Sequence, residues 1–406
     1  MNSILRSAIV VAAIAGVLGG SDAFAQDDDD VYELGSKGPP AAVVIPENDP
    51  AAVAKQLGLA ESAKPLSQLI PNWHKPKKIA VFVDNNTNRL AWFQEVAPGV
   101  TLVPAHNTAQ LLKAVVGADA AIGKFCFKPL IQAAGPQLEY IHDYHTGVEA
   151  CVAGEVPSPL RNGNIVLTNT QRVLGSSVAY HAIALMMALT RGLDIYAQQT
   201  KAGHLNPRAL PPDRLWELEG RTLLVAGLGG IGTEMARYAH MLGMHVIATK
   251  NSDRNHPDFV DYVGLSDELP SLIGKADVVM SALPLTPETT NLFNAGMFAK
   301  MKRGALFINV ARGREVVTAD LAAALESGQV GGAGLDTTEP ETEKLLASDP
   351  LWSAPNLILT PHMAGQAVES EAGVNGQLTW DVARENLRRF VNGEKVYSVV
   401  DVKRGY

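Results

Sequence analysis

The stretch TLLVAGLGGIGTEMARYAHMLG, residues 222–243, decides the fold of this chain. An apolar run comes first, a glycine-rich turn follows it, and a segment with helical periodicity completes the unit. A strand, a glycine turn and a helix in this order bind a dinucleotide pyrophosphate, because free N–H groups at the helix N-terminus face the anion. Glycine-rich turns are common, so the motif alone is a weak signal and needs support from residues further along.

Each position of this turn has its own physical reason. Gly227 permits the tight turn, Gly229 lets the backbone approach the phosphates, and Gly232 lets the helix pack on the sheet. Gly230 and Ile231 complete the predicted pyrophosphate site. The unit predicts a nucleotide domain built on a parallel sheet.

Four residues with reactive or charged side chains follow in order. They are Arg312 in NVARG, Asp336 and Glu341 in GLDTTEPE, and His362 in TPHMAG. Strand ends in open parallel sheets face the ligand crevice, and these residues lie near such ends. A guanidinium, two carboxylates and an imidazole beyond a nucleotide fold are the groups needed for hydride transfer to a 2-oxo acid.

These motifs together make the chain similar to the D-2-hydroxyacid dehydrogenases, which use NAD or NADP. The resemblance covers residues 78–400 and rests on LEGRTLLVAGLGGIG, ADVVMSALPLTPETTNLF, MKRGALFINVARG, GAGLDTTEPE and LTPHMAG. It implies an α/β fold with two doubly wound parallel-sheet domains, a Rossmann nucleotide domain being inserted in a flavodoxin-like substrate domain. It also implies a homodimer and a reaction with a small 2-oxo or 2-hydroxy acid.

The resemblance gives roles to the charged residues. His362 is the expected proton donor, since imidazole titrates near neutral pH. Glu341 is the expected orienting carboxylate. Glu339 and Glu343 lie nearby, but the family's carboxylate comes five residues after Asp336, which selects Glu341.

Arg312 is expected to bind the substrate carboxylate and carbonyl through its planar fork. Its neighbour Arg314 is expected to face solvent. Asp336 resembles the residue that holds the nicotinamide carboxamide, and a turn-capping aspartate is the alternative. The resemblance adds Pro284 and Ala311 to the cofactor-binding residues and gives no metal site.

The segment HTGVE, residues 145–149, aligns with the family loop whose backbone N–H groups bind the substrate carboxylate. Thr146 and Gly147 are therefore expected to contact substrate. His145 replaces a glycine of the family pattern and Glu149 replaces an aspartate, which puts the identity of the substrate in doubt. Lys124 is either a further contact for an acidic substrate or a solvated lysine.

The cofactor ribose is read near the end of the second nucleotide strand, where NAD-specific enzymes usually carry an acidic residue. Here ATKNSDR places Lys250, Asn251 and Ser252 at that point, with Arg254 close by. Cationic and hydroxyl donors favour NADP over NAD, and the nearby Asp253 argues the other way.

The domain organisation follows the alternation of strand-like and helix-like segments. Residues 77–171 and 365–406 are expected to form the substrate domain, and residues 172–364 the nucleotide domain. Residues 26–76 are rich in proline, which predicts an extended arm with one short helix at 49–58.

Residues 1–25 have the pattern of a signal peptide, with an apolar core at 8–19 and a cleavage pattern ending at Ala25. Export is therefore expected, to the periplasm or the secretory pathway, with no stable membrane insertion once the leader is removed. A retained membrane anchor is the alternative. The net charge of −8 and the absence of a Lys/Arg cluster argue against a nucleic-acid partner.

Cys126 and Cys151 are the two cysteines of the chain. Both follow predicted strand ends, so they either form a disulfide that tethers the substrate loop or remain unpaired thiols. A non-catalytic nucleotide-binding module on the same scaffold is the alternative function. The set of Arg312, Glu341 and His362 argues against it, and Glu341 also argues against the formate dehydrogenases of the same scaffold.

Overall fold

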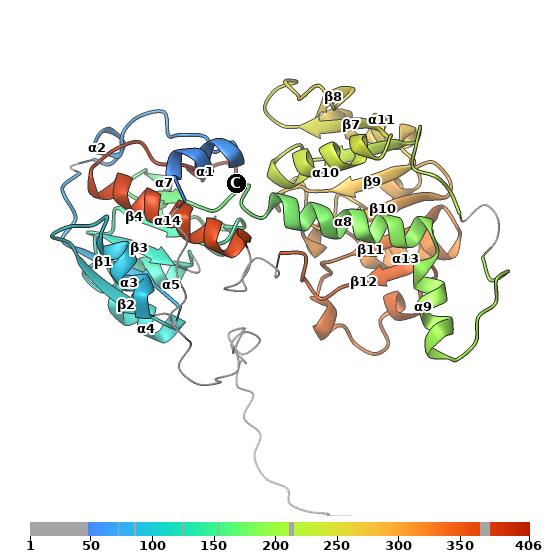
Figure 1. The fold of residues 1–406 in the computed structure, drawn as a ribbon, viewed down its shortest axis with the longest axis horizontal. Coiled ribbons are helices and arrows are strands. Elements are labelled where there is room, and N and C mark those ends of the chain that lie inside the picture. The colour runs from blue at the N-terminus through green and yellow to red at the C-terminus, as the bar shows by residue number, and fades with distance from the viewer. Residues whose placement is uncertain are drawn as a thin grey trace, which may run out of the picture. The chain divides into compact units, whose positions relative to one another are not determined.

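The computed structural model of the chain describes residues 48–406, apart from residues 72, 85–86, 124–125, 153, 211–214 and 366–373. The predicted leader, the part of the predicted arm before residue 48, and Lys124 lie outside the described residues. Two parallel sheets organise the described part, and helices cover both faces of each (Figure 1). The predicted α/β class with two doubly wound sheets is confirmed.

The first sheet has five parallel strands in the order β2-β1-β3-β4-β5, which is the flavodoxin-like order. The strands are β1 (Lys78–Phe82), β2 (Thr101–Ala105), β3 (Ala120–Gly123), β4 (Tyr140–Asp143) and β5 (Val166–Thr168). All five coincide with apolar runs in the sequence. The inner strands β1, β3 and β4 are buried almost throughout, as expected for a parallel sheet covered on both faces, whereas the edge strand β2 is partly exposed.

Helices cover this sheet because successive strand residues point to opposite faces. Ile79 packs on one side with Phe390, and Ala80 packs on the other side with Leu130. The helices of this part are α3 (Thr87–Gln94), α4 (Thr108–Ala114), α5 (Lys128–Ala134), α6 (Glu149–Val152), α7 (Ser158–Arg161) and α14 (Val374–Val391). Figure 1 shows α14, from the end of the chain, among elements from its beginning.

The described part of the N-terminal segment contains the short helix that the sequence predicts, and a second helix that it does not. It forms α1 (Pro50–Leu57) and α2 (Leu66–Leu69). Asp49 caps α1 by accepting a hydrogen bond from the backbone of Ala51, and Gly58 ends it at φ 61°. Val53 is buried against α14. The predicted short helix at 49–58 is therefore confirmed as α1. Helix α2 was not predicted, and its residue Leu66 is buried in the core of the first sheet.

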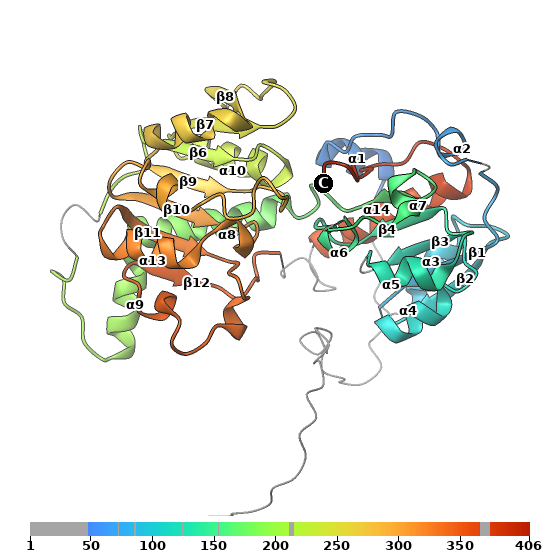
Figure 2. The same cartoon turned by 180° about the vertical axis from the view of Figure 1, so that it is seen from behind.

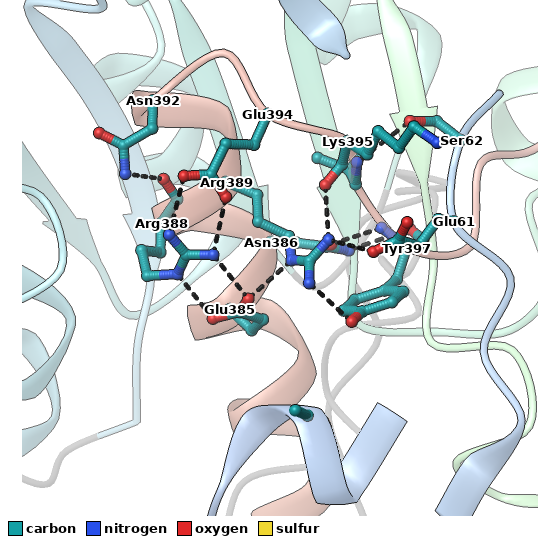
Figure 3. A network of polar contacts seen from close by, with 12 residues as sticks. Glu61, Ser62, Glu385, Asn386, Arg388, Arg389, Asn392, Glu394, Lys395 and Tyr397 are labelled. Carbon is teal, nitrogen blue, oxygen red and sulfur yellow. Dashed lines mark hydrogen bonds and ion pairs between the residues drawn. The ribbon is translucent and has the colours of Figure 1, made fainter. Parts of the chain in front are cut away.

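A polar network fastens the end of α14 to two other segments (Figure 3). Glu385 accepts hydrogen bonds from Arg388 at 2.9 Å and from Arg389 at 2.6 Å. Arg389 also donates to Glu61 at 2.8 Å and to the Tyr397 hydroxyl at 2.6 Å. Burial works to raise the pKa of Glu385, but the hydrogen bonds from both arginines hold that pKa below its ordinary value.

The second sheet has seven parallel strands in the order β12-β11-β10-β9-β6-β7-β8, a Rossmann order with one added strand. They are β6 (Thr222–Ala226), β7 (His245–Lys250), β8 (Tyr262–Leu265), β9 (Val278–Ser281), β10 (Ala305–Asn309), β11 (Val330–Leu335) and β12 (Leu357–Leu359). Six of them, all except β8, coincide with apolar runs in the sequence. Sequence reasoning missed β8, a short strand at the edge of the sheet.

Helices cover this sheet on both faces as well. Val225 and Ile308 face α8 (Gly175–Thr190) and α10 (Gly230–Met241). Leu224 and Phe307 face the opposite side, toward α12 (Ala295–Phe298) and α13 (Thr318–Glu326). Figure 2 shows α13 on the face turned away from the viewer of Figure 1. The remaining helices are α9 (Leu193–Lys201) and α11 (Leu269–Leu272). Single 3-10 turns are η3 (Ser266–Glu268), η4 (Ile273–Lys275), η5 (Gly313–Glu315), η6 (Thr342–Lys344) and η7 (Pro350–Ser353).

Within the described residues, no single helix has the length and apolar character needed to cross a bilayer. In that described part of the chain, α8 and α9 meet the criterion when they are taken together, and a 75° bend separates them.

Candidate active site

The three predicted catalytic residues come from neighbouring strands of the second sheet. Arg312 follows β10, Glu341 lies in the loop after β11, and His362 follows β12. These strands are adjacent and parallel, so their carboxyl ends deliver the three loops to one edge of the sheet.

His362 and Glu341 form a pair. The imidazole Nδ1 lies 3.1 Å from Glu341 Oε1. This hydrogen bond is the largest influence on His362 and raises its pKa above the ordinary value, although burial partly opposes the shift. Because the carboxylate accepts from Nδ1–H, the other ring nitrogen is left to hold a proton toward a substrate.

Asp336 holds the His362 loop in place. Its carboxylate accepts hydrogen bonds from the Thr360 hydroxyl at 2.6 Å and from the backbone N–H groups of Met363 and Ala364, both at 3.0 Å. Its carbonyl accepts from the backbone N–H of His362 at 2.8 Å, where the chain turns through φ 47°. These are the contacts of the alternative, a capping aspartate, and a role toward nicotinamide remains a prediction.

Asn309, the last residue of β10, holds the turn that carries Arg312. The Asn309 amide donates to the carbonyl of Arg312 and accepts from the N–H of Ala311, each at 3.0 Å. At Gly313, an added Cβ would collide with the backbone of Thr338. Glycine therefore lets this turn pack directly against the loop that carries Glu341.

Arg312 also meets the predicted substrate loop. Its Nε lies 3.0 Å from Glu149 Oε1, and its Nη2 lies 3.5 Å from Glu149 Oε2. An added Cβ at Gly147 would collide with the Arg312 guanidinium, so the loop backbone passes directly beside it. The Thr146 hydroxyl is buried and has no hydrogen-bond partner among the described residues.

The substrate loop rests on Asp143, the last residue of β4. Its buried carboxylate accepts from the backbone N–H of His145 at 2.8 Å and of Cys126 at 2.7 Å. Burial raises the pKa of Asp143 above its ordinary value. Of the two alternatives for the cysteines, the structure has the disulfide, with the Cα atoms of Cys126 and Cys151 5.4 Å apart.

The glycine turn fits a dinucleotide. Helix α10 begins at Gly230 with Gly229 as its N-cap. Gly227 has φ 98°, and an added Cβ there would lie 2.7 Å from the carbonyl oxygen of Ala282. By contrast, an added Cβ at Gly229 would meet nothing within 4 Å. Open space therefore lies beside the helix N-terminus, where the pyrophosphate of NAD(P) needs it.

At the predicted ribose site, which follows β7, the predicted donors form hydrogen bonds with other side chains of the protein. Lys250 Nζ lies 2.8 Å from Asp253 Oδ1, and the Ser252 hydroxyl donates to Asp253 Oδ2 at 3.0 Å. The hydrogen bond from Lys250 is the main reason that the pKa of Asp253 lies below its ordinary value. The Asn251 amide donates to the hydroxyl of Tyr406 at 2.8 Å.

The other predicted cofactor residues lie in the same sheet domain. Ile231 is partly buried and packs on the core around α8 and α10. Pro284 follows β9, and its carbonyl accepts from the Thr289 hydroxyl at 2.7 Å. Ala311 is buried beside Arg312.

Sequence reasoning missed three residues around this site. Glu315 is buried and accepts from the Ser281 hydroxyl at 2.5 Å, and burial raises the pKa of Glu315 to about 8. The His181 Nε2 of α8 lies 2.9 Å from the hydroxyl of Thr360. Ser281 ends a strand and was detectable on that ground, whereas His181 and Glu315 are brought there only by tertiary packing.

The comparisons with known proteins agree with this geometry. Residues 183–364 match the model of the NAD binding domain of the D-isomer specific 2-hydroxyacid dehydrogenases. The chain is 34% identical to a glycerate dehydrogenase of Methylorubrum extorquens over 236 residues, which are 57% of this chain and 70% of that protein. The chain belongs to the D-isomer specific 2-hydroxyacid dehydrogenase family.

Two further members of the family illustrate the range of similarity. The glyoxylate/hydroxypyruvate reductase B of Citrobacter koseri is 36% identical over 211 residues, and the match spans 51% of this chain but only 63% of that protein. The crystal structure of a family dehydrogenase from Xanthobacter autotrophicus Py2, in complex with NADPH and MES, superposes with a TM-score of 0.66 at 26% identity. That superposition covers 81% of this chain and 100% of the other chain.

Proposed function

We propose that the chain reduces small 2-oxo acids to D-2-hydroxy acids with NAD(P)H. The observation that carries this proposal is the meeting of Arg312, Glu341 and His362 at the ends of three adjacent strands, in the domain with the dinucleotide turn. The similarity to a glyoxylate/hydroxypyruvate reductase and to a glycerate dehydrogenase supports the substrate class. Glyoxylate, hydroxypyruvate and pyruvate are the first substrates that we propose to test. We assign residues 77–171 and 365–406 to the substrate domain and residues 172–364 to the nucleotide domain.

The residues of the chain then divide the work of the reaction. NAD(P)H, when bound, supplies the hydride that forms the new C–H bond at the carbonyl carbon. Arg312 binds the substrate carboxylate and polarises the carbonyl through its fork of N–H donors. His362 gives its proton to the carbonyl oxygen, which becomes the hydroxyl. Glu341 keeps the ring orientated and favours its protonated form.

The test uses the full chain, NADPH or NADH, and a panel of 2-oxo acids, with absorbance at the nicotinamide band as the readout. Chiral chromatography of the product then identifies the isomer. The proposal expects oxidation of the reduced cofactor and a D-2-hydroxy acid. Nucleotide binding without turnover of any 2-oxo acid would instead support the alternative, a non-catalytic nucleotide-binding module.

NADP is proposed as the preferred cofactor. Lys250, Asn251 and Ser252 offer donors to a 2′-phosphate, although Asp253 competes for two of them. The expected result is a higher kcat/KM with NADPH than with NADH, and a narrower or reversed ratio in Lys250→Asp. A preference of the wild type for NADH would overturn this proposal.

Export is proposed with removal of residues 1–25. The Cys126–Cys151 disulfide supports it, since disulfides persist mainly in oxidising compartments. N-terminal sequencing of protein from its native host should begin at Gln26. A sequence beginning at Met1 would contradict the proposal.

A homodimer is proposed as the assembly. Helix α9 has no buried residue of its own, and large apolar side chains on α8 and α9 are exposed, among them Tyr180 and Leu193. No nucleic acid or membrane is proposed as a partner. Light scattering coupled to gel filtration should give twice the mass of the mature chain, and a monomer mass at micromolar concentration would refute the dimer.

A further inference from the structure

Glu149 is the first residue of α6, and its carboxylate forms an ion pair with the Arg312 guanidinium. This is the group that binds the substrate carboxylate in the proposed function. The two contacts, at 3.0 and 3.5 Å, come from two different nitrogens of Arg312 and end on the two different carboxylate oxygens. This is the arrangement in which a bound carboxylic acid would meet the same fork. Both side chains are about one third exposed, so the pair is open to solvent and ligands.

The loop before Glu149 brings its carboxylate close to the guanidinium. The backbone at Gly147 passes so near that an added Cβ would collide with Arg312 and would lie 2.6 Å from Glu149 Oε2. The Cys126–Cys151 disulfide anchors the same short helix two residues further on. Glu149 is therefore attached to a supported loop.

Among the described residues, two further ionisable groups, His362 and Glu315, interact with this ion pair. His362 is paired with Glu341, whose hydrogen bond raises the pKa of the imidazole. Glu315 interacts electrostatically with both Arg312 and Glu149, and burial raises the pKa of Glu315 to about 8, so it is mainly uncharged at neutral pH. Arg312 therefore has its positive charge already matched by Glu149 before a substrate arrives.

We propose that Glu149 is a specificity-determining residue that restricts the site to 2-oxo acids with a single carboxylate. A monocarboxylate adds one negative charge around Arg312, which Glu149 can share or yield. A dicarboxylate adds two negative charges. The described residues named here offer no unpaired cation for its second carboxylate, because Arg312 is paired with Glu149 and His362 with Glu341. This inference rests on the proposed function, since it takes Arg312 as the substrate anchor.

Kinetics with pyruvate and oxaloacetate test the inference directly, because these 2-oxo acids differ by one carboxylate. The proteins are the wild-type full chain, Glu149→Gln, which removes the charge, and Glu149→Asp, which keeps the charge on a shorter side chain. Glu155→Gln is the matched control, because this exposed glutamate lies a few residues further along the same segment. Thermal melting of each variant checks folding.

The wild type should prefer pyruvate. Glu149→Gln should raise kcat/KM for oxaloacetate roughly tenfold more than for pyruvate, because removal of one like charge favours the more highly charged ligand. The gain should lie mainly in KM. Glu149→Asp should keep the preference for the monocarboxylate, and Glu155→Gln should behave as the wild type.

Two results would overturn the inference. An unchanged ratio of the two substrates in Glu149→Gln would remove Glu149 from specificity. A fall in kcat/KM for both substrates would mean that Glu149 only holds Arg312 in position.

A binding measurement separates this inference from the proposed function. Calorimetry with oxamate and with tartronate, in the presence of NADP, compares a monocarboxylate and a dicarboxylate without turnover. Should the wild type turn over no 2-oxo acid, the proposed function fails. The inference still stands if tartronate gains roughly tenfold over oxamate in Glu149→Gln, and it falls if the ratio does not change.

Discussion

Two glutamate–cation pairs lie at the candidate active site, and they have opposite consequences. Glu341 lies 3.1 Å from His362, and Glu149 lies 3.0 Å from Arg312. Imidazole titrates near neutral pH, so its carboxylate partner changes how readily it carries a proton. Guanidinium is always charged, so its carboxylate partner can only compete for its donors. The same contact therefore supports proton transfer in one pair and limits anion binding in the other.

The largest expected effect on activity comes from the pair of His362 and Glu341, which acts in proton transfer. His362→Ala should lower kcat by roughly 10²–10⁴-fold, the usual contribution of a general acid. The KM should change much less, because the carboxylate anchor remains. Steady-state kinetics measure both, and His256→Ala, an exposed histidine of the nucleotide domain, is the control. A kcat near that of the wild type would exclude His362 as the proton donor.

Arg312→Lys tests the other pair. Ammonium cannot reproduce the planar fork, so one charge-assisted hydrogen bond should be lost, at a cost of about 1.5–3 kcal/mol, or roughly 10- to 150-fold in kcat/KM. Arg314→Lys, two positions away and exposed, should leave kcat/KM unchanged. If lysine at position 312 restores both kcat and KM, a two-point contact with substrate is wrong.

The smallest expected effect on activity concerns the disulfide that supports α6, the helix that begins at Glu149. The bridge closes a loop with a sequence separation of 25 residues, for which chain entropy gives about 3.5 kcal/mol of stabilisation. Replacement of Cys126 and Cys151 together by alanine should lower the melting temperature and raise KM a few-fold, with kcat nearly unchanged. Reducing agent should change the wild type in the same direction and leave the double variant unaffected. Equal melting of reduced and oxidised wild type would contradict this support.

The sequence predicted the sheets and the catalytic edge well, for a physical reason. Parallel strands buried on both faces are continuous apolar runs, and their ends are marked by polar residues such as Arg312 and His362. Spacing along the chain therefore located these residues before any contact was known. The glycine turn was predicted equally well. Gly227 has a positive φ and no room for a Cβ, and a Cβ at Gly232 would collide with the backbone of Gly227.

The remaining features depend on which segments pack together, and spacing does not encode that. The helix at Pro50–Leu57 was predicted, but its packing on α14, which follows it by more than three hundred residues, was not. The sequence placed Lys250 and Asp253 close together, but it did not predict that they form an ion pair. Glu149 was noted as a departure from the family pattern, but its contact with Arg312 required the fold to bring a loop of the first sheet to the edge of the second.

The pH dependence of kcat/KM for reduction, measured for the wild type, Glu341→Gln and Glu149→Gln, tests the contrast between the two pairs most directly. Reduction needs protonated His362, so activity should fall as the pH rises through the pKa of this residue. Glu341 raises that pKa through its hydrogen bond, so the fall in Glu341→Gln should begin at lower pH than in the wild type. Glu149→Gln should change the height of the profile and keep the position of the fall. A fall at the same pH in all three proteins, or a shift in Glu149→Gln alone, would contradict the account.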